Sequence, residues 1–169
     1  RDLLNLSQIE SGYFHIEKSE FDLTSLINCI LDKYKAVFLE KNIKIEFKAV
    51  EELYVCADMV RVEQIITNYL NNAINHIDEN KLIKISTDII NDKIKICVFN
   101  SGKHIPEESL DKIWKSFYKV DKARTRAYGG YGLGLSIVKA IVELHGTECG
   151  VENVEDGVVF WFEIGRMKA

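Results

Sequence analysis

The spacing of apolar residues divides the chain into helices and strands. Apolar residues recur every three or four positions in four segments, and this period predicts helices at 1–10, 22–42, 59–78 and 133–145. Alternation with polar residues and short apolar runs predict strands at 43–47, 51–57, 82–90, 93–99, 147–154 and 158–164. Residues 13–21 are expected to be extended.

Residues at the ends of these segments support the division. Asp22 and Asp58 each stand where a helix needs an N-cap. Asn91-Asp92 suits a hairpin turn, and Pro106 followed by two glutamates suits the first turn of a short helix. Strands and helices do not alternate as they do in βαβ units. We therefore predict an α/β (α+β) two-layer sandwich of about three helices on a five-stranded sheet that is mixed but mostly antiparallel.

Composition adds limits to this picture. Hydrophobic residues make up 47% of the chain and charged residues 28%, which is typical of a globular domain. The net charge of −4 gives no reason to expect a nucleic acid partner. The longest apolar run, Val158–Phe162, is too short to span a membrane, so we expect no direct membrane contact. The chain begins at Arg1 without Met, so we expect a piece of a longer protein.

The cysteines and histidines are scattered along the chain. Cys29, Cys56, Cys97 and Cys149 form no C-x-x-C pair, and each lies within an apolar stretch. We therefore expect four reduced core residues. The histidines do not have the spacing of a metal-ligand set.

The predicted helix at 59–78 carries a feature that folding alone explains poorly. Its apolar face consists of Val62, Ile65, Ile66, Tyr69, Leu70, Ala73, Ile74 and Ile77. Its other face consists of Arg61, Gln64, Asn68, Asn71, Asn72 and Asn75. An asparagine costs about 0.5–0.7 kcal/mol relative to alanine in a helix, so lysine or glutamate would serve better on a solvated face. Asn68 and Asn72 lie one turn apart on one side, where their carbonyl oxygens suit a hard cation or the orientation of phosphates. A polar surface stripe is the alternative.

Two glycine-containing segments and the stretch between them raise the odds of a ligand site. Asn100–Gly102 directly follows a strand, so the Asn100 side chain would accept a hydrogen bond from an exocyclic amine such as that of adenine. Gly129–Gly134 precedes a helix, and glycines there let a phosphate approach the helix N-terminus. Residues 117–126 hold four basic residues and one acid, a local charge of +3 that suits a polyphosphate. An ordinary turn, a flexible hinge and a solvated loop are the respective alternatives.

Together these motifs resemble the catalytic, ATP-binding domain of sensor histidine kinases, within the superfamily that includes gyrase, mismatch-repair and heat-shock chaperone ATPases. D-M-V-R-V-E-Q-I-I-T-N-Y-L-N-N-A-I-N-H resembles the N box, N-S-G-K-H-I the first glycine box and G-G-Y-G-L-G-L-S-I-V-K the second. Phe117-Tyr118 resembles the aromatic box. The motifs occur in the family's order over about residues 20–165. The resemblance implies a mobile ATP lid.

The resemblance also implies roles by position. Asn72 would bind Mg²⁺ and Asn68 would orient the phosphates or a metal-bound water, which makes these two the catalytic candidates. Asn100 would read the adenine amine, with Gly102 and Ile105 shaping the base pocket. The remaining nucleotide-binding candidates are Asn75, His76, Phe117, Tyr118, Lys119, Lys122, Arg124, Arg126, Gly130, Gly132, Leu133 and Gly134.

Five positions depart from the family's pattern. Asn100 stands where many members have Asp, so we expect weaker base discrimination. Asn75 stands where a Lys or Arg often touches phosphate, which removes one cation. His104 replaces a usual glycine, His76 occupies a common aromatic position, and Tyr131 replaces a usual small residue in the lid.

The N-terminal stretch L-L-N-L-S-Q-I-E-S-G resembles the end of the second helix of a dimerisation and phosphoacceptor domain. The resemblance implies a division into residues 1–12 from that helix, a connector at 13–21 and an ATP-binding domain at 22–169. The phosphoacceptor motif H-E-[LIF]-[RK]-T-P does not occur, so the receiving histidine is expected upstream of Arg1. The implied parent is a homodimeric phosphoprotein anchored in the membrane, with this part in the cytoplasm and a response regulator as its partner.

The expected function is that of a protein-histidine kinase in two-component signal transduction. The domain would bind Mg-ATP and present the γ-phosphate to a histidine on another domain. A superfamily ATPase is the first alternative, but such enzymes usually carry Glu at the position of Asn68, and an amide cannot serve as that base. A nucleotide-binding docking module without catalysis is the second. The absence of H-R-D and D-F-G motifs excludes a conventional Ser/Thr kinase.

Overall fold

The computed structural model describes residues 15–48, 50, 52–115 and 134–167. Within them the elements are β1 (Ser19–Asp22), α2 (Leu23–Glu40), β2 (Lys44–Phe47), β3 (Tyr54–Ala57), α3 (Met59–His76), β4 (Leu82–Ile90), β5 (Lys93–Ser101), the 3₁₀ turn η1 (Glu107–Ser109), α5 (Gly134–Leu144), β6 (Cys149–Val154) and β7 (Gly157–Arg166). No helix among these residues is long and apolar enough to cross a membrane.

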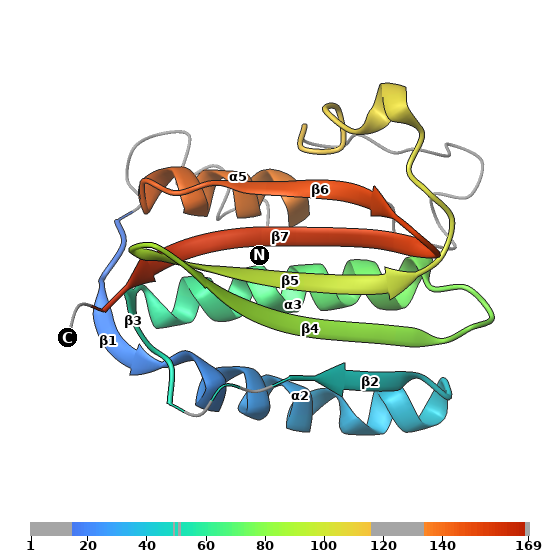
Figure 1. Cartoon of the computed structure of the whole chain (residues 1–169), viewed down its shortest axis with the longest axis horizontal. Coiled ribbons are helices and arrows are strands. Elements are labelled where there is room, and N and C mark those ends of the chain that lie inside the picture. The colour runs from blue at the N-terminus through green and yellow to red at the C-terminus, as the bar shows by residue number, and fades with distance from the viewer. Residues whose placement is uncertain (1–14, 49, 51, 116–133, 168–169) are drawn as a thin grey trace.

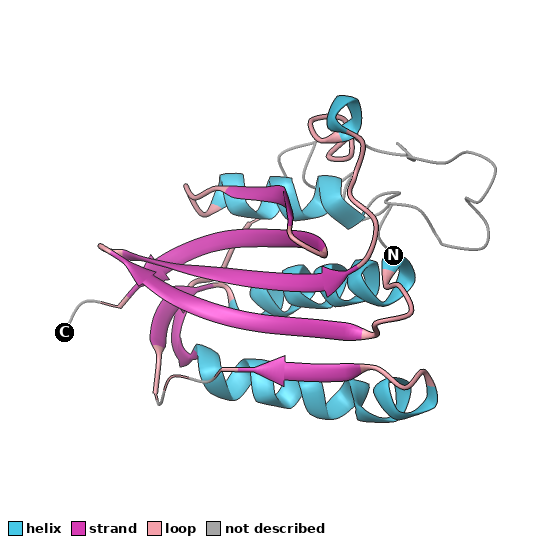
Figure 2. Cartoon of the chain, turned by 45° about the vertical axis from the view of Figure 1, so that its right-hand side comes forward, coloured by secondary structure: helices cyan, strands magenta, loops and turns pink. Residues whose placement is uncertain are grey.

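The strands form one sheet with the order β1-β3-β7-β5-β4-β2, and β6 also pairs with β7. Only β2 and β4 run parallel among the described pairs. Helices α2, α3 and α5 cover one face of this sheet and leave the other face open (Figures 1 and 2). The predicted two-layer α/β sandwich with a mixed, mostly antiparallel sheet is therefore confirmed. The predicted number of five strands is wrong, because the described sheet has seven, with the short strands β1 and β2 at its ends.

The core lies between the helices and the sheet. Ile94, Ile96 and Val98 alternate along β5 and are buried beneath the helices, as a period of two requires. Both predicted N-caps are confirmed: Asp22 accepts a hydrogen bond from the Thr24 amide at 3.1 Å, and Asp58 accepts one from the Arg61 amide at 3.2 Å.

Two predictions about local structure need correction. The helix expected after Pro106 is a single 3₁₀ turn, in which the Ser109 amide donates to the Pro106 carbonyl. All four cysteines are free, but Cys29 and Cys56 are exposed rather than part of the core. Each occupies an outward position of its helix or strand, so the apolar residues beside it are buried while the cysteine is not.

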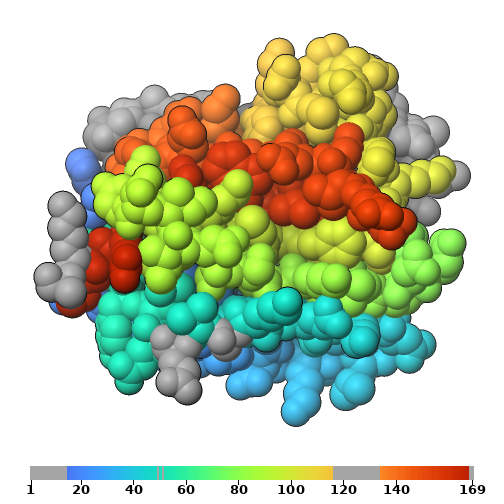
Figure 3. Space-filling view, viewed as in Figure 1, coloured from blue at the N-terminus to red at the C-terminus, as the bar shows by residue number. Residues whose placement is uncertain are grey.

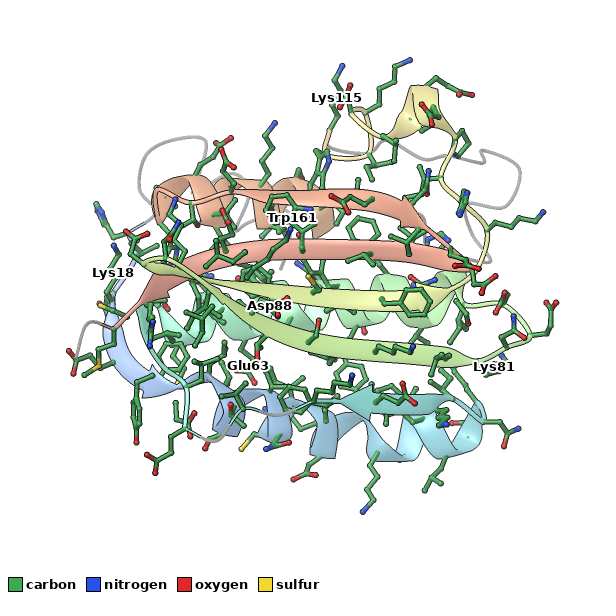
Figure 4. The ribbon with its side chains drawn as sticks, viewed as in Figure 1. Lys18, Glu63, Lys81, Asp88, Lys115 and Trp161 are labelled. Carbon is green, nitrogen blue, oxygen red and sulfur yellow. The ribbon has the colours of Figure 1, made fainter. Side chains whose placement is uncertain are left out.

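The open face of the sheet carries aromatic side chains. Trp161 on β7 lies across Gly150 on β6, where an added Cβ would stand 2.5 Å from the indole ring. The Lys95 ammonium group lies 4.4 Å from the centre of the same ring, which suits a cation–π contact. This face is toward the viewer in Figures 3 and 4, on the opposite side of the sheet from helix α3, which carries the asparagine motif.

Candidate nucleotide site

Helix α3 is held in one rotation by its apolar face. Tyr69 is fully buried, packs against Phe160 and Phe162 with ring centroids 5.4 and 6.0 Å away, and donates its hydroxyl to the Trp161 carbonyl at 2.9 Å. Because this side faces the sheet, the asparagine side of α3 faces away from it. The helix thereby determines where the polar side chains of the motif lie.

The four asparagines of α3 lie in different environments. The Asn71 side chain is exposed and accepts a hydrogen bond from the Tyr34 hydroxyl on α2 at 2.7 Å. The Asn68 amide donates to the Gly134 carbonyl at the start of α5 at 3.3 Å. Asn75 is exposed, whereas Asn72 is buried. The polar face of α3 is therefore divided among different neighbours, because α2 contacts Asn71 and α5 contacts Asn68.

Asn72 has the least satisfied side chain of this group. Its Nδ2 atom is buried and has no hydrogen-bond partner among the described residues. A buried amide without a partner costs about 1–3 kcal/mol, so such a group needs an explanation beyond folding. An asparagine amide offers a carbonyl oxygen to a hard cation and an N–H donor to a phosphate oxygen. Asn72 therefore fits the Mg²⁺ and phosphate role that the motif implies.

The end of β5 meets the end of α3. Asn100 is buried, and its Nδ2 atom donates to the Ser101 carbonyl at 3.1 Å, which leaves its Oδ1 atom as the acceptor. An added Cβ on Gly102 would lie only 2.7 Å from the His76 carbonyl oxygen. Only glycine fits this approach of the two backbones. The first glycine motif and the last turn of the asparagine helix are thus direct neighbours.

His76, which contacts Gly102 through its backbone carbonyl, has an imidazole with a shifted pKa. Burial lowers the pKa of its imidazole below the ordinary value, because the charged form loses its hydration. The neutral ring therefore predominates at neutral pH. An imidazole in that form suits contact with an uncharged base better than contact with phosphate.

The segment that begins at Gly102 runs alongside the turn between β6 and β7. The Gly102 amide donates to the Asp156 carbonyl at 3.1 Å, and a ring nitrogen of His104 lies 2.7 Å from the Val154 carbonyl oxygen. Ile105 is buried, and both of its backbone groups pair with the Asn153 side chain. Asn153 was missed by sequence reasoning, because a single asparagine near a strand end carries no motif signal.

Gly134 opens α5 beside Asn68. An added Cβ there would lie 3.7 Å from the Asn68 side chain, which is ordinary van der Waals contact. The described structure therefore gives no steric requirement for glycine at this position. The remaining candidates, and with them the expected ATP lid, lie outside the described residues: Phe117, Tyr118, Lys119, Lys122, Arg124, Arg126, Gly130, Gly132 and Leu133.

The arrangement of the described candidates agrees with similarities to known proteins. The profile of the histidine kinase-, DNA gyrase B- and HSP90-like ATPase family matches residues 57–167, which run from the end of β3 through β7. The chain belongs to this family. Within the family it is similar to the catalytic domains of sensor histidine kinases.

The catalytic domain of histidine kinase ThkA is 37% identical, with a TM-score of 0.80, over 89% of this chain and 97% of that one. Sensor histidine kinase WalK of Bacillus subtilis is 31% identical over 91% of this chain and 26% of its own length. Autoinducer 2 sensor kinase/phosphatase LuxQ of Vibrio cholerae is 34% identical over 96% of this chain and 20% of its own. The chain thus spans about a quarter or less of these two relatives, and as a histidine kinase catalytic domain it corresponds to one part of them.

One solved structure contains ThkA in complex with the response regulator protein TrrA, and ThkA in it is 34% identical over 98% of this chain and 47% of that one. The full-length kinase ShkA in complex with AMPPNP has a TM-score of 0.85 at 22% identity, which shows the shared fold alone. The sequence-based recognition of the sensor histidine kinase family is therefore confirmed.

Proposed function

We propose that the chain binds Mg-ATP and supplies the γ-phosphate to a histidine on a separate phosphoacceptor domain. The observation that carries this proposal is the buried amide nitrogen of Asn72, which has no hydrogen-bond partner among the described residues and lies in a helix that contacts both glycine motifs. Buried polar groups that serve only the fold are paired in the great majority of cases. A group between two ligand-type motifs that no described residue pairs with is suited to a ligand.

The described residues divide the work between base and phosphates. Asn100 keeps its amide donor on the Ser101 carbonyl and offers its oxygen, which accepts from an exocyclic amine such as that of adenine. Asn68 and Asn72 serve the phosphate end, and Mg²⁺, when bound, neutralises phosphate charge there. Asn68 is held by the Gly134 carbonyl, so it orients rather than takes a proton. Binding and alignment are thus the contributions of this chain, and the acceptor imidazole supplies the nucleophile.

We propose in addition that residues 1–12 belong to a dimerisation and phosphoacceptor domain, with 13–21 as connector and 22–169 as the ATP-binding domain. Part of the connector stretch pairs into the sheet as β1. The complex of the related ThkA with a response regulator supports a response regulator as partner of the parent protein. The parent's homodimeric state and its membrane anchor belong to the same proposal.

Calorimetric titration tests the binding step. ADP and a non-hydrolysable ATP analogue are titrated into the chain with and without Mg²⁺, beside Asn72→Ala and Asn71→Ala. Asn71 is the matched control, because it neighbours Asn72 on α3 but bonds to α2. We expect Asn72→Ala to abolish the Mg²⁺ dependence and Asn71→Ala to retain it. Equal behaviour of the two variants would reject the role of Asn72, and absence of Mg²⁺-dependent nucleotide binding would favour a docking module without catalysis.

The transfer step needs a separate assay with γ-labelled ATP. The chain alone should label none of its own histidines, and labelling should appear on an added phosphoacceptor domain of the same parent. Steady release of phosphate that survives Asn68→Ala would favour a superfamily ATPase instead.

A further inference from the structure

The Asn153 side chain, at the end of β6, forms hydrogen bonds with both backbone groups of Ile105, a residue outside the sheet. Its Oδ1 atom accepts a hydrogen bond from the Ile105 amide at 2.8 Å, and its Nδ2 atom donates to the Ile105 carbonyl at 2.8 Å. A primary amide is the one neutral side-chain group that matches both backbone groups of a residue at once. The pair replaces the ladder bonds that Ile105 would have if it lay in a strand.

These two hydrogen bonds fix the position of the segment that joins Asn100 to the η1 turn. The upstream end of the segment is fixed where Gly102 abuts the His76 carbonyl and donates to the Asp156 carbonyl. Asn153 fixes the downstream end by holding Ile105, which is only 5% exposed. A short segment tied at both ends follows one path, so the groups on it need no ordering when a ligand binds.

We propose that Asn153 is a positioning residue that sets the affinity and base selectivity of the nucleotide site by holding Ile105. The inference rests on the proposed function, and within it on the role at the base that the family resemblance implies for Ile105. Asn153 reaches the base through Ile105. Without the amide pair, the Ile105 backbone would lose both partners, the segment would take several paths, and the site would distinguish an amine from a carbonyl group on the base less well.

The first test measures the hold itself without any nucleotide. Hydrogen exchange of the Ile105 amide in the 169-residue chain should be slow and should accelerate in Asn153→Leu, which matches asparagine in shape but makes neither bond. Amides of the β5–β7 ladder should keep their rates. Unchanged exchange at Ile105 in the variant would overturn the inference.

The second test measures the consequence by calorimetry with Mg-ADP and Mg-GDP. For Asn153→Leu we expect about tenfold weaker ADP binding and a smaller ratio between the two nucleotides, because two partly buried hydrogen bonds are lost. Asn153→Ser keeps one hydroxyl for one of the two backbone groups and should give an intermediate loss. This second variant also serves if the leucine variant does not fold.

Thr24→Val provides the control for a purely structural effect. It removes one hydrogen bond, from the Thr24 hydroxyl to the Val50 carbonyl at 2.7 Å, in a different part of the fold. It should lower the melting temperature while leaving both nucleotide affinities unchanged. If Asn153→Leu behaved in the same way, with unaltered affinity and selectivity, Asn153 would be structural only and the inference overturned. Failure of the unaltered chain to bind either nucleotide would overturn the proposed function and this inference with it.

Discussion

The buried polar groups at the two ends of helix α3 differ in their hydrogen bonding. At the first end, Asp58 is 7% exposed, and its two carboxylate oxygens accept from the amides of Glu17 and Arg61 at 2.9 and 3.2 Å. Its own amide donates to Nε2 of His145 at 3.1 Å. Near the other end, Asn72 is 9% exposed and its amide nitrogen has no partner among the described residues. The two side chains are buried to a similar degree, but only that of Asp58 has its hydrogen bonds made within the described residues. The network around Asp58 therefore serves folding, whereas the Asn72 side chain is suited to a ligand.

The geometry of the first end explains its role. His145 accepts at Nε2, so its other ring nitrogen carries the proton and donates to the Ile141 carbonyl at 2.9 Å. The start of α3, the end of α5 and the segment before β1 therefore meet in one network. Figure 4 labels Lys18, which follows Glu17 in the chain, near one end of the molecule, and Lys81, which lies shortly after the end of α3, near the opposite one. The network around Asp58 and the last residues of α3 are therefore at different ends of the molecule.

The largest effect on stability is expected from disrupting the hydrogen-bond network around Asp58. Asp58→Ala removes an N-cap and a contact to the Glu17 amide, so it should lower the free energy of unfolding by about 2–4 kcal/mol in urea titrations. The exposed Asp111→Ala is the control and should change little. Nucleotide affinity measured well below the melting temperature should stay unchanged. A loss of affinity with intact stability would contradict the separation of the two ends.

The reverse result is expected at Asn72. Asn72→Leu replaces a buried amide nitrogen that no described residue pairs with by an apolar side chain of similar volume, so the free energy of unfolding should stay the same or rise by about 1 kcal/mol. Mg²⁺-dependent nucleotide binding should disappear in the same variant. Destabilisation as large as that of Asp58→Ala would show that the Asn72 amide serves the fold.

A smaller effect is expected from pH. Burial lowers the pKa of His76 in the folded chain, so the unfolded chain binds a proton more readily. Stability should therefore be complete at pH 7.5 and should fall as the pH drops through the unfolded value of 6.5 towards the lower folded one. His76→Gln should reduce this slope, whereas the exposed His15→Gln should leave it unaltered. An equal slope in both variants would assign the pH dependence to other groups.

The smallest effect is expected where α3 meets α2. Tyr34→Phe removes the hydroxyl that bonds to Asn71 and also contacts the Thr67 side chain, so the free energy of unfolding should fall by about 0.5–1 kcal/mol. A double-mutant cycle with Asn71→Ala isolates this pair, and the second change should add little once the first is made. Full additivity would mean that the two side chains do not interact in solution.

Much of the fold could be predicted because its signals are local. The aspartates before α2 and α3 cap these helices as expected, and the alternation along β4 and β5 places them in a hairpin with Asn91 at φ 57°. The motifs also carry positional information, so the contacts of Asn68 with Gly134 and of His76 with Gly102 join segments that the resemblance had grouped. The β1 pairing was not foreseen, because a four-residue edge strand has too short a pattern.

By itself the sequence determined the elements, their caps and the family to which the chain belongs, because periodicity, capping and motif order act over short stretches. Only the tertiary structure decided which polar side chains are satisfied. Asn71 and Asn72 are neighbours with the same chemistry, yet one bonds to α2 and the other is buried without a partner among the described residues. The position of Asn153 against Ile105 belongs to the same class of fact. These differences depend on contacts between distant segments, and no local pattern encodes them.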